Sequence, residues 1–381
     1  MNNIKKIEVF DTTLRDGEQT PNVSFDRESK LSIIKNLKKM KIDVCEIGMP
    51  ISSHKDFTDI NYLTSQDIDI EFVALSTIKK TDILKTYECL KNAKKKRIHL
   101  VFATSEINLK YRFKINKEEC LNIIEEGIKY SKKYFDTVQF AAEDATRTEL
   151  SFLKLVYQKA IDSGATYLTI PDTVGICTPD EYGNIIKFLK QNLDYNENIK
   201  FSLHCHNDLG LATANTLSGI LNGGDEIQCT INGIGERSGN CPLEEIVAIL
   251  KYKTDKYYTV VNSKYLLETS KMVSKFSNII VQANKAIVGD NSFKHASGIH
   301  QDGIIKNPKL YQFLNPEDFG IDKIELIIDK SSGRNGLKNK LKELNIDESK
   351  IDIKLLLENI KKNKIINDQI IIEEVNKIKD N

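Results

Sequence analysis

The sequence predicts an α/β fold, a (β/α)₈ barrel followed by a smaller, mainly helical C-terminal segment. Three observations predict it: eight short β-branched apolar runs, segments of helical periodicity between them, and polar residues directly after nearly every run. The chain of 381 residues, 40% of them hydrophobic, can bury a large core. Eight alternations of strand and helix over about 250 residues are typical of a TIM barrel.

The eight candidate strands are the runs IEVF at 7, VCEIGM at 44, EFVALS at 71, IHLVFA at 98, TVQFAA at 137, YLTI at 167, KFSLHC at 200 and IQCTI at 227. Their starts lie about 30 residues apart, the length of one strand and helix unit. The segments between them, such as 29–40 and 150–164, place apolar residues at helical spacing. An open doubly wound sheet is the alternative, but it normally has fewer strands.

The pattern changes after about residue 255. We expect a helix over 265–277, then an extended, glycine-containing stretch over 284–303, and then Lys-rich helical sequence to the end. These changes predict a catalytic barrel over residues 1–275 and a linker or lid subdomain over residues 276–381, packed beside the barrel mouth.

The charge balance and the cysteines limit the class of protein. Lys and Arg number 55 against 54 Asp and Glu, so no strong field would attract nucleic acid or an anionic membrane. The seven cysteines are dispersed and form no CxxC pair, as expected for reduced thiols. The N-terminus lacks a signal-peptide pattern, and no run of about 18 apolar residues occurs. We therefore expect a cytoplasmic protein that binds neither nucleic acid nor membrane.

Polar residues follow nearly every predicted strand. They are Asp11 to Asp16, Glu46, Ser76 and Thr77, Thr104 and Ser105, Glu143 and Asp144, Asp172 and Thr173, His204 to Asp208, and Asn232. The carboxyl ends of barrel strands meet at one mouth, where the active sites of this fold lie. The sequence therefore predicts a functional mouth.

The motif HCHND at 204–208 is the strongest local signal. His204 and His206 are two residues apart on a strand and point to one face, whereas Cys205 points outward. The chain has only six histidines, and two of them lie in register here. This favours a pair of metal ligands over two histidines that only satisfy local hydrogen bonds. Asp16 is the leading oxygen ligand, since the first strand neighbours the eighth, and Asn240 could add a carbonyl oxygen. Such a donor set suits magnesium, manganese or zinc.

Other candidate groups are weaker. Arg15 could hold a carboxylate or stabilise a developing alkoxide, although a surface salt bridge is the alternative. The glycines of NGIGERSGN could approach a ligand or only form a tight turn. His295 and His300 lie outside the predicted barrel and would act in proton transfer only if a lid brought them to the mouth.

Four motifs resemble one enzyme family: DTTLRDGEQ at 11–19, HCHNDLGLATAN at 204–215, NGIGERSGN at 232–240 and SGIHQDG at 297–303. They are similar to signatures of the 2-isopropylmalate, homocitrate and citramalate synthases, and the likeness runs from about residue 6 to 345 in register. The resemblance implies a Claisen condensation of acetyl-CoA with a 2-oxo acid, followed by thioester hydrolysis, in a homodimer.

The resemblance also implies site residues. Metal ligands at matching positions are Asp16, His204, His206 and Asn240. Catalytic roles fall on Arg15 at the ketone oxygen, on Glu143 near the oxo acid or its bound water, and on His300 and Tyr311 in moving the acetyl methyl proton. Substrate-binding positions are Leu75, His99 and Thr173.

The choice of oxo acid is less sharply predicted. PISSHKDF at 50–57 and HQDG at 300–303 favour an isopropylmalate synthase, whereas EDATRTEL at 143–150 and the chain length also suit homocitrate-type enzymes, and a citramalate synthase is a further alternative. A lyase of the same superfamily and a non-catalytic barrel are less favoured. Many isopropylmalate synthases continue into a leucine-binding domain that this sequence has no room for, so we expect activity without leucine feedback.

Overall fold

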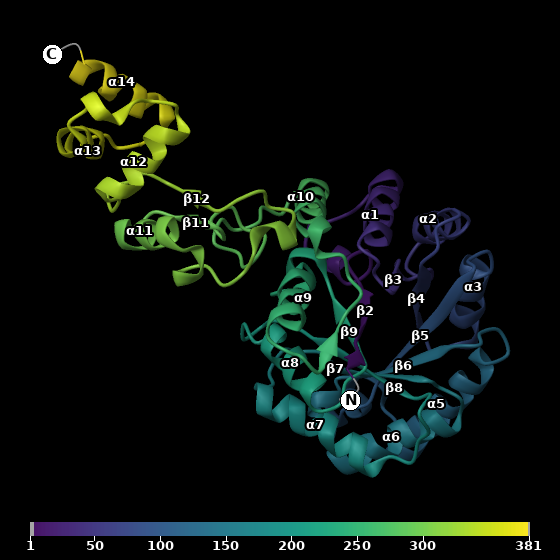
Figure 1. Cartoon of the computed structure of the whole chain (residues 1–381). Helices are drawn as coiled ribbons and strands as arrows, with labels where there is room; N and C mark the ends of the chain where they lie inside the picture. The colour runs from purple at the N-terminus through teal and green to yellow at the C-terminus, as the bar shows by residue number, and fades with distance from the viewer. Residues whose placement is uncertain (1–3, 380–381) are drawn as a thin grey trace. The chain divides into compact units, whose positions relative to one another are not determined.

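The computed structural model describes residues 4–379 and divides into two compact units, Met1–Ile280 and Val281–Asn381 (Figure 1). The sequence analysis placed this boundary slightly earlier, before residue 276. The outermost residues of both predicted ranges, 1–3 and 380–381, lie outside the described part.

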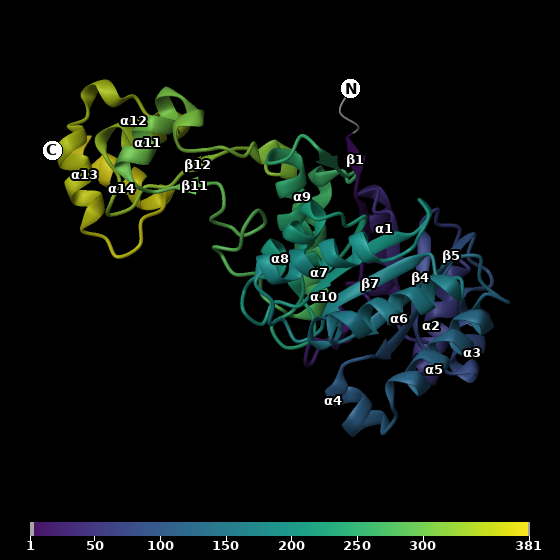
Figure 2. The same cartoon turned by 90° about the horizontal axis from the view of Figure 1, so that it is seen from below.

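The first unit is a closed barrel of eight parallel strands in the order β2 to β9, with β2 paired to β9. Figure 2 shows β4, β5 and β7 among the helices that surround them. The strands are β2 Glu8–Asp11, β3 Val44–Glu46, β4 Glu71–Thr77, β5 Lys95–Ala103, β6 Val138–Glu143, β7 Tyr167–Asp172, β8 Lys200–Cys205 and β9 Glu226–Cys229. Each overlaps one of the eight predicted runs. The predicted (β/α)₈ barrel is confirmed, and the open sheet is wrong because the first and last strands are hydrogen bonded.

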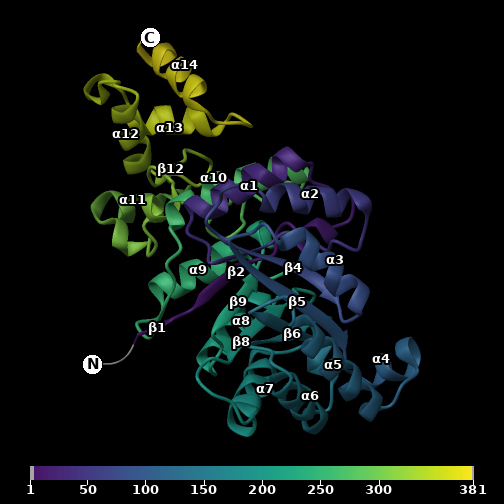
Figure 3. The same cartoon turned by 90° about the vertical axis from the view of Figure 1, so that its right-hand side faces the viewer.

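Helices alternate with these strands and surround the barrel (Figure 3). They are α1 Arg27–Lys39, α2 His54–Thr64, α3 Lys80–Leu90, α4 Glu106–Asn108, α5 Lys117–Ser131, α6 Leu150–Asp162, α7 Pro179–Asn192, α8 Ala212–Leu221, α9 Leu243–Tyr252 and α10 Leu266–Ser277. Short helical turns are η1 Gly17–Gln19, the π-helical η2 Leu109–Phe113, η3 Ala145–Arg147, η4 Ile231–Gly233 and η5 Ser263–Tyr265. A two-stranded sheet pairs β1 Lys5–Lys6 with β10 Tyr257–Tyr258.

The helix α1 illustrates how the sequence specifies these elements. The Asp26 side chain caps its N-terminus by accepting a hydrogen bond from the Ser29 N–H. Leu31, Ile34 and Leu37 recur at helical spacing and are buried. The apolar stripe therefore packs inward, as the periodicity predicts.

The second unit is mainly helical, as the sequence predicts. It contains α11 Gly298–Lys306, α12 Arg334–Glu343, α13 Ile353–Lys361 and α14 Asp368–Lys379, with the turns η6 Pro308–Leu310, η7 Pro316–Phe319 and η8 Glu348–Lys350. A small parallel sheet pairs β11 Lys294–His295 with β12 Glu325–Leu326. The hydrophobic core of this second unit includes Leu337, Leu341, Leu356, Ile360 and Ile371. Among residues 4–379, no helix is long and apolar enough to cross a membrane.

A buried ion network lies at the end of the barrel where the strands begin. Arg97 is 1% exposed, and its Nη1 donates to Glu226 Oε2 at 2.6 Å while its Nη2 donates to Glu71 Oε2 at 2.7 Å. The guanidinium also stacks 3.5 Å from the centre of the Tyr167 ring. These partners all stand in the first residues of their strands, so this network closes the floor of the barrel opposite the mouth.

Substitution Arg97→Met should destabilise the protein by about 3–5 kcal/mol, because it leaves the Glu226 carboxylate buried without its charge partner. The free energy of unfolding in urea measures this loss. Adding Glu226→Gln should restore part of it, since an amide is neutral. Lys94→Met, which removes an exposed ion pair with Asp67, serves as control and should change stability little. A stable Arg97→Met variant would contradict the proposed structural role.

Candidate active site at the barrel mouth

A cavity of about 330 Å³ opens at the carboxyl ends of the strands. Side chains from the barrel strands and the loops that follow them line it, including Arg15, Asp16, Leu75, His99, Glu143, Thr173, His204 and His206. Eight positions predicted from sequence therefore share one cavity. Their roles stay predictions, but their common location is what the strand-end pattern requires.

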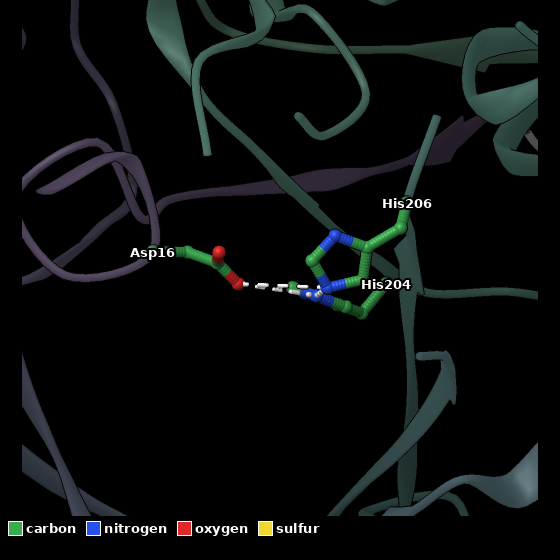
Figure 4. A group of neighbouring side chains, drawn as sticks. All are labelled: Asp16, His204 and His206. Atoms are coloured by element: carbon green, nitrogen blue, oxygen red, sulfur yellow. Dashed lines mark hydrogen bonds and ion pairs between the residues drawn. The ribbon is translucent and has the colours of Figure 1, made fainter. Parts of the chain in front are cut away.

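Asp16, His204 and His206 form a buried cluster inside this cavity (Figure 4). Asp16 Oδ2 lies 3.4 Å from His204 Nε2 and 3.9 Å from His206 Nε2. The two Nε2 atoms are 3.2 Å apart. One ligand atom from each residue falls within 4.8 Å of the others, a spacing that a single cation can span.

Among the described residues, a hydrogen bond to a neighbouring side chain orients the imidazole of His204, whereas His206 Nδ1 has no partner. His204 Nδ1 lies 2.9 Å from Gln228 Oε1. The Gln228 amide nitrogen donates hydrogen bonds to the hydroxyl oxygens of Thr169 and Ser202, which fixes the amide with its oxygen toward His204. An amide oxygen only accepts, so Nδ1 carries a proton, and in the neutral ring Nε2 is then the atom that can bind a metal ion. Burial and the neighbouring His204 lower the pKa of His206 to about 4, so its ring is neutral near pH 7. Neutral imidazoles are the metal-binding form.

Asn240 lies beside the same cluster. Its backbone pairs with His206, and its Nδ2 donates to the Ile234 carbonyl at 3.2 Å. Asn240 Oδ1 and Asp16 Oδ1 are both buried without a hydrogen-bond partner among the described residues. Two unsatisfied buried oxygens next to two imidazoles fit a divalent metal ion, because such an ion would bind all four groups.

The glycines of NGIGERSGN make this packing possible. Gly235 has a φ of +155°, and a Cβ there would lie 2.1 Å from Asn240 Nδ2 and 3.3 Å from Asp16 Oδ1. Only glycine lets the loop after β9 pass this close to both side chains. The sequence left open whether these glycines approach a ligand or only form a tight turn. At Gly235, the missing side chain leaves room for Asn240 and Asp16.

Arg15 is held between two carboxylates at the cavity wall. Its Nη1 donates to Asp16 Oδ2 at 3.0 Å, and its Nε donates to Glu46 Oε2 at 2.6 Å. Burial would raise the pKa of Asp16, but the adjacent Arg15 charge together with the neighbouring His204 and His206 holds that pKa well below its usual range. The surface salt bridge considered from sequence is therefore wrong, since the side chain of Arg15 is only 10% exposed.

Glu46 was expected at the barrel mouth, but the sequence indicated no role for it. Its Oε1 accepts from His99 Nδ1 at 2.7 Å while its Oε2 binds Arg15, so it orients two cavity residues at once. Burial alone would raise its pKa, but the Arg15 charge and the hydrogen bonds from His99 and Thr12 lower that pKa to about 2. A carboxylate within the short apolar run VCEIGM was the available signal, because an acid buried in a barrel strand needs a partner.

Two further predicted residues stand at the rim. Glu143 ends β6, and its Oε1 accepts from Arg112 Nη1 at 2.7 Å. The Thr173 hydroxyl, just after β7, accepts from the Asp144 N–H at 2.9 Å. Both side chains face the cavity, so they lie where a substrate would contact them.

His300 and Tyr311 belong to the second unit. Their rings stack with centres 4.2 Å apart and planes inclined by 22°. Gly303, one turn along α11 from His300, allows this packing, because a Cβ there would lie 2.4 Å from the Tyr311 ring. The two residues are thus neighbours within their own unit, and their part in proton transfer stays a prediction.

Comparison with known proteins gives the family. The HMGL-like family model matches residues 6–273, and the model described as homocitrate synthase post-HMGL domain-like matches residues 287–367. A 2-isopropylmalate synthase of Streptococcus gallolyticus is 46% identical over 362 residues, which cover 94% of this chain and 69% of that protein. The chain belongs to the 2-isopropylmalate synthase family.

A second relative has the same family name. 2-Isopropylmalate synthase 1 of Caldanaerobacter subterraneus is 43% identical over 90% of this chain and 86% of its own length. Among solved structures, a Bacillus subtilis HMG-CoA lyase matches with a TM-score of 0.64 at 19% identity, covering 74% of this chain and 98% of that one. That likeness shows the barrel fold alone.

The Gln228 contact gives a test of the cluster. Gln228→Met should weaken the binding of Zn²⁺ or Mn²⁺ by roughly 10- to 100-fold, because His204 loses the partner that fixes its tautomer. Competition with a fluorescent chelator measures the affinity. Gln158→Met on α6, where Gln158 contacts Asp194, is the matched control and should bind metal normally. Equal affinities in both variants would remove Gln228 from the site.

Proposed function

We propose that this protein is a metal-dependent 2-isopropylmalate synthase, an acyltransferase that condenses acetyl-CoA with 2-oxoisovalerate and then hydrolyses the thioester, the first committed step of leucine biosynthesis. The observation that carries the proposal is the buried cluster of Asp16, His204 and His206 with Arg15 beside it, in a chain 46% identical to a protein of that name.

The cluster would hold the metal. Asp16, His204, His206 and Asn240 supply two oxygens and two imidazole nitrogens, a set that suits Mn²⁺, Mg²⁺ or Zn²⁺. A bound divalent ion would act as a Lewis acid toward the ketone of the 2-oxo acid.

Arg15 and the rim residues would handle charge and orientation. The Arg15 guanidinium is fixed by Glu46 and Asp16, so it is preorganised to stabilise negative charge that develops on the ketone oxygen. Glu143 and Thr173 face the cavity and would contact the oxo acid or its bound water, while His99 and Leu75 form its wall. A fixed charge of this kind accelerates the reaction because no reorganisation is needed during it.

The acetyl methyl group also needs a base. A thioester α-proton is weakly acidic, so its removal requires a positioned acceptor and stabilisation of the enolate. We assign this proton transfer to His300 and Tyr311, whose stacked rings already form a pair within the second unit. A homodimer and a cytoplasmic location remain predictions from the sequence.

The cavity wall favours a branched apolar substrate. Its apolar lining includes Met49, Leu75, Val101, Ala141 and Pro171. A distal carboxylate, as in 2-oxoglutarate, would require a cation to compensate its desolvation.

The cavity arginines are already engaged. Within residues 4–379, Arg15 pairs with Asp16 and Glu46, Arg112 with Glu143, and Arg237 with Asp208. This pairing supports 2-oxoisovalerate over 2-oxoglutarate, and an isopropyl group would fill more of the apolar wall than the methyl group of pyruvate.

The substrate assignment predicts the outcome of a CoA-release assay. With acetyl-CoA and 2-oxoisovalerate, 2-oxoglutarate and pyruvate in parallel, kcat/KM should be highest for 2-oxoisovalerate, by roughly 10- to 200-fold over pyruvate. Free thiol is measured after chelation and after metal restoration, and turnover should return only with metal. A preference for 2-oxoglutarate would instead make the protein a homocitrate synthase.

His206→Ala should abolish turnover without unfolding the barrel, because His206 supplies one of the clustered nitrogens at the mouth. Bound metal is quantified by elemental analysis, and the fold is checked by circular dichroism and thermal melting. His54→Ala, at the exposed start of α2, is the control and should keep both metal and activity. Normal turnover in His206→Ala would exclude it as a ligand.

A further inference from the structure

The segment that follows β5 reaches over the barrel rim to Glu143. It runs through α4 and the π-helical turn η2, which ends where Lys114 adopts a left-handed conformation with φ of +57°. Arg112, in the last turn of η2, donates from Nη1 to Glu143 Oε1 at 2.7 Å. Both residues line the cavity, and no sequence motif predicted their contact.

We propose that Arg112 is a positioning residue for Glu143, holding one carboxylate oxygen so that the other faces the substrate. The proposal rests on the proposed function, since it assigns Glu143 a part in that reaction. Glu143 is 28% exposed at its side chain, so without a partner this carboxylate would sample several rotamers. A guanidinium fixes a carboxylate with directional hydrogen bonds, which an isolated rim carboxylate lacks.

Polar contacts fasten the segment to the residue next to Glu143. Asp144 is buried and left-handed, with φ of +66°. Its Oδ2 accepts from Ser105 Oγ at 2.5 Å and from Asn108 Nδ2 at 3.1 Å, both at the start of the segment. Arg147 adds two hydrogen bonds to the same carboxylate, at 2.7 and 2.8 Å. The segment and Glu143 are therefore held by one anchor.

Apolar contacts fix the other end of the segment. The Phe113 ring stacks on Phe102 of β5 with centres 4.5 Å apart and planes inclined by 13°. The Arg112 guanidinium lies 5.0 Å from the centre of the Phe113 ring. Leu109 is buried at the first position of η2. Arg112 is thus held both by an aromatic ring and by Glu143, which limits its rotamers before any substrate arrives.

One rival role is binding of the CoA phosphates, because the Arg112 side chain is 54% exposed. The two roles differ in kinetics. A residue that orients Glu143 for the reaction changes kcat, whereas one that only binds a remote phosphate raises the KM for acetyl-CoA and leaves kcat unchanged.

The test compares Arg112→Gln, Arg112→Lys, Glu143→Gln and the double variant Arg112→Gln/Glu143→Gln in the CoA-release assay. In Arg112→Gln, kcat should fall by about 10- to 100-fold, with both KM values within about threefold of wild type, because a small misplacement of a reacting group is costly. Arg112→Lys should recover part of the loss. The double variant should be no slower than Glu143→Gln, since the arginine then has no carboxylate to orient.

Lys117→Gln is the matched control. Lys117 starts α5 just beyond the segment and pairs with Glu149 at 2.6 Å, with similar exposure, but it does not line the cavity. It should leave kcat and both KM values unchanged.

Three results would overturn the proposal: a rise only in the KM for acetyl-CoA, wild-type kinetics in Arg112→Gln, or additive losses in the double variant. If the wild-type protein releases no CoA with any of the three oxo acids, the proposed function fails instead. The same four variants are then compared by calorimetric titration with 2-oxoisovalerate. Non-additive affinities would still support the pairing, and additive or unchanged affinities would reject it.

Discussion

The candidate site depends on the closure of the barrel between its first and last strands. β2 pairs with β9 through Val9 and Ile227, Phe10 and Gln228, and Asp11 and Cys229. This register places the turn after β2 next to the ends of β8 and β9. Asp16 comes from that turn and His204 from β8, so residues almost 190 positions apart along the chain share one cluster. Without closure, no local feature of the sequence would bring a carboxylate to the two imidazoles.

A second constraint is the compensation of buried charge. Arg15 sits between Asp16 and Glu46, and Glu46 also accepts from His99. Each charged group offsets the desolvation cost of its neighbour, because a buried ion is costly unless it is paired and hydrogen bonded. The arrangement leaves the Nε2 atoms of His204 and His206 facing Asp16 and one unsatisfied oxygen on Asp16 and on Asn240. The barrel therefore supports its polar mouth with a connected set of contacts rather than with isolated ion pairs.

The sequence predicts most of the barrel, because each strand carries its own apolar run and each helix its own periodicity. The closeness of His204 and His206 was also predictable, since a spacing of two residues at the end of a strand predicts a common direction, although His206 lies one residue beyond β8. Contacts between distant elements were not. Gln228 and Glu46 act through hydrogen bonds across strands, and their partners follow from register rather than from motif. Arg112 was missed for a different reason: a π-helical turn ended by a left-handed lysine has no periodic signature, so its direction is visible only in the structure.

The Arg97 network closes the floor, while the cluster and Arg15 stand at the opposite end of the barrel. Folding and chemistry thus use different layers of side chains. Loops at the mouth can exchange residues during evolution without disturbing the charges that keep the cylinder intact, and new substrate preferences can arise on an unchanged scaffold.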